Sequence, residues 1–191
     1  MRLGKVAALS AVVSICSGCA FQSQAVKIHP DVKSSATING GGKGVQLSVR
    51  DERPSKVIGQ RGVGGAGADM TVEGDLVNIV SGAVLSGLSQ RNFSASNTGD
   101  GAAQLRVEIR NLSSKNIMGF WSGTLRDEFS LKGACKSSKG TDYEEMYNGV
   151  FETSLQVVPT GEANDKYVSQ AVADSVNKLV SDDKMLRCLA E

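Results

Sequence analysis

The chain has 191 residues, which suits one folded domain with or without a tail. Hydrophobic residues make up 40% of it and charged residues 21%, so it can bury a core beneath an ordinary soluble surface. The formal net charge is +1 with no long run of like charge, which argues against nucleic-acid binding and against electrostatic docking on acidic lipid.

Residues 1–18 have the pattern of a cleaved signal peptide. A positive start at Arg2 and Lys5 precedes an apolar stretch over 6–15, which is too short for a permanent membrane span. The ending Ser17-Gly18-Cys19-Ala20 resembles a bacterial lipobox, in which small residues precede a cysteine that receives lipid. We therefore expect lipidation at Cys19. Removal of residues 1–18 leaves 19 basic and 20 acidic side chains.

The lipobox resemblance also implies a location. Lipoproteins of this type carry acyl chains such as palmitate on the cysteine, and Ala20, in place of an inner-membrane Asp, implies the periplasmic side of the outer membrane. Cys16 departs from the pattern, which usually has leucine there. The alternative is ordinary cleavage after Ala20, with Gly18 and Ala20 as the small pair and a freely soluble product.

The mature chain is expected to begin with a tether. Polar residues and the glycine run 40–44 make residues 19–44 the lipidated N-terminus and a flexible tether, with room for a short edge strand where Val26 and Ile28 alternate with Lys27. Residues 45–191 are expected to form a single α+β domain. Its first strand starts at Val45, where apolar and polar residues alternate, and ends near Pro54.

A helix follows a glycine-rich loop at 59–67. Apolar residues recur at helical spacing from Leu76 to Leu88, with Asp75 as N-cap and Asn92 closing the helix in a left-handed conformation. Strands are predicted over 103–112, 124–136 and 143–158, with a bulge at Asp127, where the apolar alternation breaks.

A long helix over 168–179 and a short apolar piece over 185–189 end the chain. The order β-α-β-β-β-α predicts a two-layer α+β sandwich. Its sheet would be mostly antiparallel, with about four strands and two helices on one face.

The candidate chemical motifs favour structural interpretations. Gly62 to Gly67 match G-x-G-x-x-G, but the helix begins too late for a dinucleotide site, so a mobile loop is expected. His29 is the only histidine and lies in the predicted tether, which almost excludes a histidine-based triad. Acidic pairs are scattered without metal-ligand spacing. We expect no catalytic site, no metal, no cofactor and no enzyme activity.

Cys135 and Cys188 are the thiols that remain beyond Cys19 after cleavage. In an oxidising compartment a disulfide is favoured, and two buried free cysteines are the alternative. Phe120 and the sole tryptophan, Trp121, lie between two predicted strands. They either cap one end of the core or form an exposed apolar tip that inserts into a partner or a membrane interface.

The mature chain resembles the YajG-like family of bacterial lipoproteins. The resemblance rests on Cys19-Ala20, on the segment Val49-Arg50-Asp51-Glu52-Arg53, which is similar to the family's V-x-D-x-R, and on Gly59. It extends to the helix ending at 91–93, although the family usually has Gly where Asn92 stands, and to the closing helix. It implies a location and a fold but no mechanism.

These observations favour an outer-membrane-anchored periplasmic lipoprotein that acts as a non-enzymatic binding or accessory module for a cell-envelope partner. A binder of an envelope small molecule, lipid or glycan is the alternative. A hydrolase is the weakest hypothesis, because the sequence shows no Ser/Lys or carboxylate pair for it.

Overall fold

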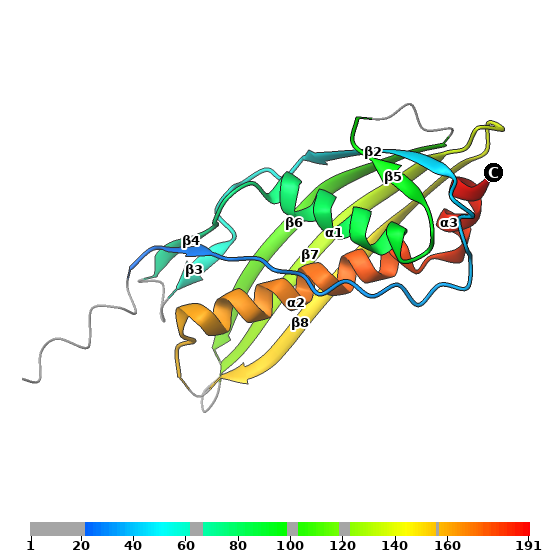
Figure 1. Cartoon of the computed structure of the whole chain (residues 1–191). Helices are drawn as coiled ribbons and strands as arrows, with labels where there is room; N and C mark the ends of the chain where they lie inside the picture. The colour runs from blue at the N-terminus through cyan, green and yellow to red at the C-terminus, as the bar shows by residue number, and fades with distance from the viewer. Residues whose placement is uncertain (1–21, 62–66, 99–102, 119–122, 156) are drawn as a thin grey trace, which may run out of the picture.

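The computed structural model describes residues 22–61, 67–98, 103–118, 123–155 and 157–191. They hold eight strands and three helices (Figure 1). The strands are β1 (Gln24–Val26), β2 (Gly44–Asp51), β3 (Gly59–Arg61), β4 (Ala68–Val72), β5 (Ser94–Ser96), β6 (Ala103–Met118), β7 (Gly123–Lys136) and β8 (Asp142–Leu155). The helices are α1 (Leu76–Ser89), α2 (Gly161–Val180) and α3 (Asp183–Ala190).

The long strand β6 organises the sheet. On one side it pairs along its length with β7, which in turn pairs with β8, and both pairings are antiparallel. On the other side its first half pairs in parallel with β2, and its second half meets β3 at Ser114. Strand β5 extends the sheet beyond β2, while β4 and then β1 extend it beyond β3.

The predicted fold class is wrong. The described strands form one curled, half-barrel sheet of eight strands in which four of the seven pairings are parallel, instead of a two-layer sandwich with about four mostly antiparallel strands. Strands β3, β4 and β5, which the sequence did not predict, have only three to five residues, and the short edge strand expected around Val26 is β1. Strands that short carry too little alternation to be recognised, and distant parts of the chain hold them in place.

The bulge is also misplaced in the prediction. Strand β7 passes through Asp127 in regular register, with Asp127 opposite Ser114 on β6 and Phe151 on β8. The register instead shifts on β6 between Ile109 and Asn111. This irregularity lies where β2 ends and before β3 begins to pair, so it marks the change of neighbour along β6.

Helices α1 and α2 lie side by side on the inner face of the sheet (Figure 1). The predicted caps of α1 are confirmed: Asp75 Oδ1 accepts from the amide of Val77 at 2.9 Å, and Asn92 has a φ of 59°. Gly87 of α1 faces Val180 of α2, where an added Cβ would lie 2.8 Å from both methyl groups. The core between helices and sheet includes Leu47, Leu88, Leu105, Phe129, Leu131, Leu179 and Met185.

The segment predicted as a flexible tether packs on the domain from Gln24 onward, so that prediction is wrong for this part. We call residues 24–37 the N-terminal strap. Strand β1 pairs with β4, and the remainder runs along α2 in extended form (Figure 1). Buried side chains alternate strictly with exposed ones from Val26 to Thr37, apart from the half-buried Pro30. The buried set includes Val26, Ile28, Val32, Ser34 and Ala36.

Hydrogen bonds to one polar stripe of α2, and to the α3 start, hold the strap. Two residues of extended chain advance about 6.6 Å and four residues of helix about 6 Å, so every second strap amide meets a new helical turn. The amides of Lys27, His29, Lys33, Ser35 and Thr37 donate to Asp165, Ser169, Asn177, Ser181 and Asp183, respectively, at 2.8–3.2 Å. Ala173, at the intervening turn, offers no side-chain acceptor.

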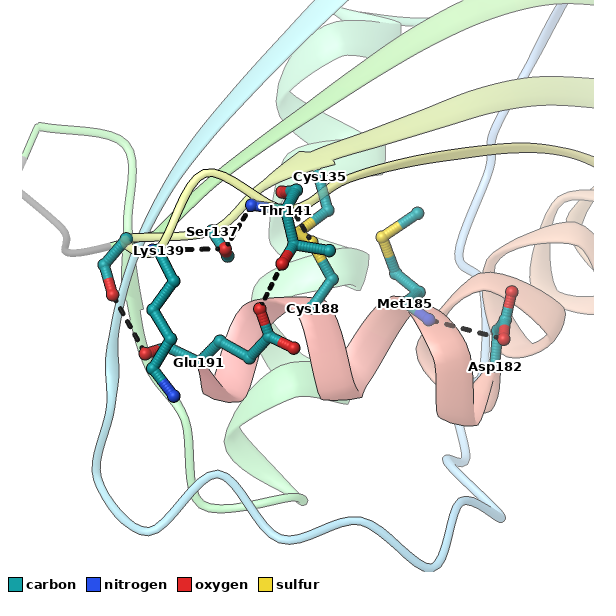
Figure 2. The surroundings of a disulfide bond; sticks show 9 residues. Cys135, Ser137, Lys139, Thr141, Asp182, Met185, Cys188 and Glu191 are labelled. Atoms are coloured by element: carbon teal, nitrogen blue, oxygen red, sulfur yellow. Dashed lines mark hydrogen bonds between the residues drawn. A yellow bond between two sulfur atoms is a disulfide. The ribbon is translucent and has the colours of Figure 1, made fainter.

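Cys135 on β7 and Cys188 on α3 form a disulfide, as predicted, with their Cα atoms 6.3 Å apart (Figure 2). Both residues are buried. The surrounding contacts fasten the last residue to the β7–β8 turn: the Ser138 hydroxyl donates to the main-chain oxygen of Glu191 at 2.9 Å, and the Thr141 hydroxyl donates to its carboxylate. The disulfide therefore closes the end of the sheet that carries the C-terminus.

Among the described residues, no helix is both long enough and sufficiently apolar to cross a membrane.

Candidate functional site

Several predicted site residues lie outside the described part of the chain. These are Cys19, Phe120, Trp121 and the glycine-loop residues 62–66. His29 belongs to the strap, where its side chain is exposed and its amide donates to Ser169 at 2.9 Å. Groups of three or more His, Cys, Asp or Glu side chains suited to a metal ion are absent from the ranges that the structure describes.

The V-x-D-x-R segment forms a buried ion pair at the end of β2. The Arg53 guanidinium donates to both Asp51 carboxylate oxygens at 2.8 and 2.9 Å, and Lys56 adds a third contact at 2.8 Å. The side chains of Arg53 and Asp51 are only 3% and 9% exposed. These hydrogen bonds, with that from Arg53 as the largest cause, hold the Asp51 pKa well below its ordinary value despite partial burial.

This ion pair lies at the end of β2, where the chain stops pairing with β6 before β3 pairs with it again. The amide of Glu52 donates to the carbonyl oxygen of Ile109 on β6. After the connecting segment, the amide of Ser114 on β6 donates to the carbonyl oxygen of Ile58. The next residue, Gly59, crosses β6 so closely that an added Cβ would lie 2.2 Å from the Ser114 carbonyl oxygen. The motif and the glycine that carry the family resemblance therefore have a structural role in the sheet.

The outer face of the sheet is the candidate functional surface. Residues of β7 alternate between buried positions on the inner face and half-buried positions on the outer face up to the exposed Lys136, and the helices pack on the inner side. Polar and charged side chains from β2, β6, β7 and β8 fill the outer face. Because an antiparallel sheet can leave one face in solvent, exposure alone assigns no function to it.

A hollow of about 550 Å³ lies on this face near the disulfide end. Its polar lining includes Gln46, Ser48, Gln104, Arg106, Lys136, Asp142 and Glu144. A second hollow of about 410 Å³ shares Glu144 and adds Arg110, Lys132, Glu145 and Met146. We call the two together the outer-face hollow.

Ion pairs organise the charges of the outer-face hollow. Glu108 accepts from Arg106 at 3.2 Å and also contacts Arg110, while Lys132 contacts Glu144 at 2.7 Å. The hydrogen bond from Lys132 lowers the Glu144 pKa from its ordinary value. Basic and acidic groups thus alternate across neighbouring strands, which gives a mixed-charge surface suited to recognising a partner with complementary polar groups.

From the sequence, the sheet surface is a candidate only for the alternative binder of a small molecule or glycan, together with the loop at 59–67, and no residue of this face is singled out. Arg106, Glu108 and Arg110 alternate with apolar residues along β6, as polar residues do on any strand that faces solvent on one side. Their assembly with Lys132 and Glu144 depends on the register of β6, β7 and β8. The sequence signal is the charge alternation itself, and it does not distinguish a binding face from ordinary surface.

Asp127 is a buried carboxylate on the opposite, inner face of β7. Its side chain is fully buried, and neither oxygen has a hydrogen-bond partner within normal geometry. Burial raises its pKa to about 6, an effect that the nearby Ser114 hydroxyl partly opposes. This environment keeps the carboxyl group protonated up to about pH 6, well above the range in which an exposed aspartate ionises.

The family of the chain follows from its sequence match. Residues 30–190 match the sequence profile of a family described as "uncharacterized lipoprotein". The chain belongs to this lipoprotein family. The match confirms the resemblance to YajG-like lipoproteins that the motif segments predicted. No curated protein matches the chain at a significant level.

Comparison with solved structures finds similarity at low sequence identity. A crystal structure of a protein from Xanthomonas campestris superposes with a TM-score of 0.61 at 10% identity, covering 86% of this chain and 95% of that one. A minor lipoprotein from Acinetobacter baumannii has a TM-score of 0.44 at 14% identity, covering 78% of this chain and 93% of that one. The first similarity establishes a shared fold.

Proposed function

We propose that this lipoprotein is held at the periplasmic side of the outer membrane by acyl chains on Cys19 and acts there as a non-enzymatic binding module for a cell-envelope protein. Membership of a lipoprotein family and the lipobox-like Ser17-Gly18-Cys19-Ala20 support the anchor. Ala20 after the cysteine supports the outer membrane. At about 0.8 kcal/mol per buried methylene, two or more acyl chains give stable anchoring.

The outer-face hollow carries the binding proposal. It spans four strands, and salt bridges hold its charged side chains in place on a rigid sheet. Met146 lines it and is 42% exposed, and Val150, further along β8, is 40% exposed. A surface that combines fixed mixed charge with exposed apolar side chains has the composition of a moderately polar protein interface.

The test is site-specific photo-crosslinking in intact cells. A photoreactive amino acid at position 146 reports on the outer-face hollow, and the same residue at the exposed position of Gln170, on α2, is the matched control. One protein adduct formed from position 146 and not from position 170 is the expected result. Identical adducts from both positions would contradict a specific partner on this face.

A polar small molecule or a glycan is the second candidate occupant. The hollow of about 550 Å³ falls in the size range of ligand sites, and its lining of Gln46, Gln104, Arg106 and Asp142 offers hydrogen-bond donors and acceptors. Absence of a protein adduct, together with a lipid or glycan that co-purifies and is lost from an Arg106→Ala variant, would favour this candidate over the protein partner.

A further inference from the structure

Side-chain hydrogen bonds and strand register bring several chain segments to one end of the domain, which we call the anchor end. The Gln24 side chain donates to the carbonyl oxygen of Gly161 at 2.8 Å, so the start of the strap touches the start of α2. Leu155, six residues before Gly161, is paired with Gly123, and Gly123 is paired with Met118. The anchor end therefore holds the first strap residue, the end of β6 and the β8–α2 connection (Figure 1).

The strap leaves little free chain between this end and Cys19. Gln24 is five positions after Cys19, and five fully extended residues span at most about 18 Å. Since β1 and the strap are fixed to the sheet and to α2, the domain cannot move away by unrolling a longer tether. An acyl group on Cys19 would keep the anchor end within this distance of the lipid headgroups.

The same end carries the most exposed large apolar side chains among the described residues. Val157 is 78% exposed and Ile117 is 54% exposed, whereas Val57, Met146 and Val150 are 40–42% exposed. Val157 lies in the β8–α2 connection, and Ile117 lies one residue before the end of β6. Lys115, two residues before Ile117, is exposed beside it and supplies a positive charge.

We propose that the anchor end rests on the lipid surface, with Val157 and Ile117 in contact with the headgroup and acyl-chain boundary. The proposal rests on the Cys19 anchor given above, and it adds a defined orientation. Burying apolar side chains at this boundary is favourable in proportion to their apolar area. The disulfide end and the outer-face hollow near it then face away from the membrane.

Spin labelling of the lipidated protein in vesicles of phosphatidylethanolamine and phosphatidylglycerol tests this orientation. With Cys19 acylated and Cys135 bridged to Cys188, an introduced cysteine is the one free thiol of the mature chain. Val157→Cys and, independently, Ile117→Cys report on the anchor end. Lys139→Cys, exposed in the β7–β8 turn at the opposite end, is the matched control.

The expected result is a several-fold lower collision rate with a water-soluble nickel chelate at positions 157 and 117 than at 139, with a higher collision rate with oxygen. Equal nickel accessibility at all three positions overturns the membrane contact. Low accessibility to both reagents at 157 also overturns it, because protein would then cover this side chain. The mass of the N-terminal peptide is measured on the same sample. A peptide without acyl mass overturns the proposed anchor and this orientation with it, whereas acylated protein with exposed labels overturns the orientation alone.

Discussion

Asp127 is a carboxylate where the β7 pattern demands an apolar side chain. Leu125, Phe129 and Leu131 occupy the neighbouring inner positions of the strand and are buried like Asp127. Burial of an ionised carboxylate without hydrogen-bond partners costs free energy, and the protein limits this cost by favouring the protonated form. The apolar alternation of the sequence breaks at this residue, and a break of that kind looks the same whether the strand bulges or buries a polar group.

The Asp127→Asn variant should be more stable than the parent at neutral pH. The folded-state pKa of about 6 exceeds the unfolded value, so the folded protein holds a proton that the unfolded chain releases between about pH 4 and 6. Parent stability is therefore lost relative to the variant as pH rises through this range. The expected gain is about 2 kcal/mol above pH 6, vanishing below pH 4.

Urea unfolding of parent and variant at a series of pH values measures this difference. The low pKa of Asp51 has the opposite effect: it stabilises the folded protein at pH values above the pKa that Asp51 has in the unfolded chain. This contribution is the same in parent and variant, so it cancels in the difference between them. A difference that does not change with pH would mean that Asp127 stays ionised in the folded state.

At the scale of elements, the sequence predicts the helices and strands whose own residues show a clear apolar periodicity. Helix α1 with its cap at Asp75, helix α3 and the long strands β2, β7 and β8 are placed close to their observed positions, whereas α2 begins at Gly161, seven residues before its predicted start. Strand β6 was expected to end at 112 and continues to Met118. Beyond the bulge its inner side chains include Leu112 and Ser114, and the polar Ser114 removes the alternation by which a half-buried strand is recognised.

The strap shows a different limit of sequence reasoning. Its side chains alternate between buried and exposed, but the buried set mixes Val32 with Ser34 and Ala36, so its apolar content is low. What holds it is the polar stripe of α2, 140 or so positions away in the chain. A pattern shared between two distant segments leaves no signal in either one alone.

Removing the acceptors of the strap should loosen it without unfolding the domain. In the double variant Ser169→Ala and Asn177→Ala, the amides of His29 and Lys33 lose their partners, at a cost of about 1 kcal/mol each. Hydrogen exchange at these two amides should become faster, with proteolysis within the strap. Gln170→Ala, a change at an exposed position on the same helix, should leave exchange unchanged. Protection that survives the double variant would show that apolar burial alone fixes the strap.

At the scale of the whole molecule, the parallel pairings decide the fold class. Each one joins segments separated by other elements, such as β2 with β6 and β1 with β4. The linear order of strands and helices supports several sheet arrangements, and the choice depends on close approaches such as Gly59 against Ser114. The outer-face hollow also depends on this sheet arrangement, because only the pairing of these strands brings its charged side chains together.

The disulfide should contribute strongly to global stability. It links residues 53 positions apart, and loop-closure entropy assigns about 4 kcal/mol to a link of this length as an upper figure. A Cys135→Ala and Cys188→Ala double variant should therefore unfold at lower urea concentration than the oxidised parent. Two thiols that label in the unfolded, unreduced parent would contradict the bridge, whereas equal stability of parent and variant would contradict the predicted stabilisation.

The course of the strap determines how the molecule responds to mechanical load. Its chain enters at the anchor end and runs lengthwise along α2, while its hydrogen bonds lie across that direction. If Cys19 is anchored as proposed, tension on the N-terminal end of the strap would act along its length and load these hydrogen bonds together in shear. A strap running the opposite way would be peeled off one bond at a time, at much lower force. Under the proposed anchoring, the packing that leaves so few residues between Cys19 and β1 would therefore also resist detachment of the strap from α2.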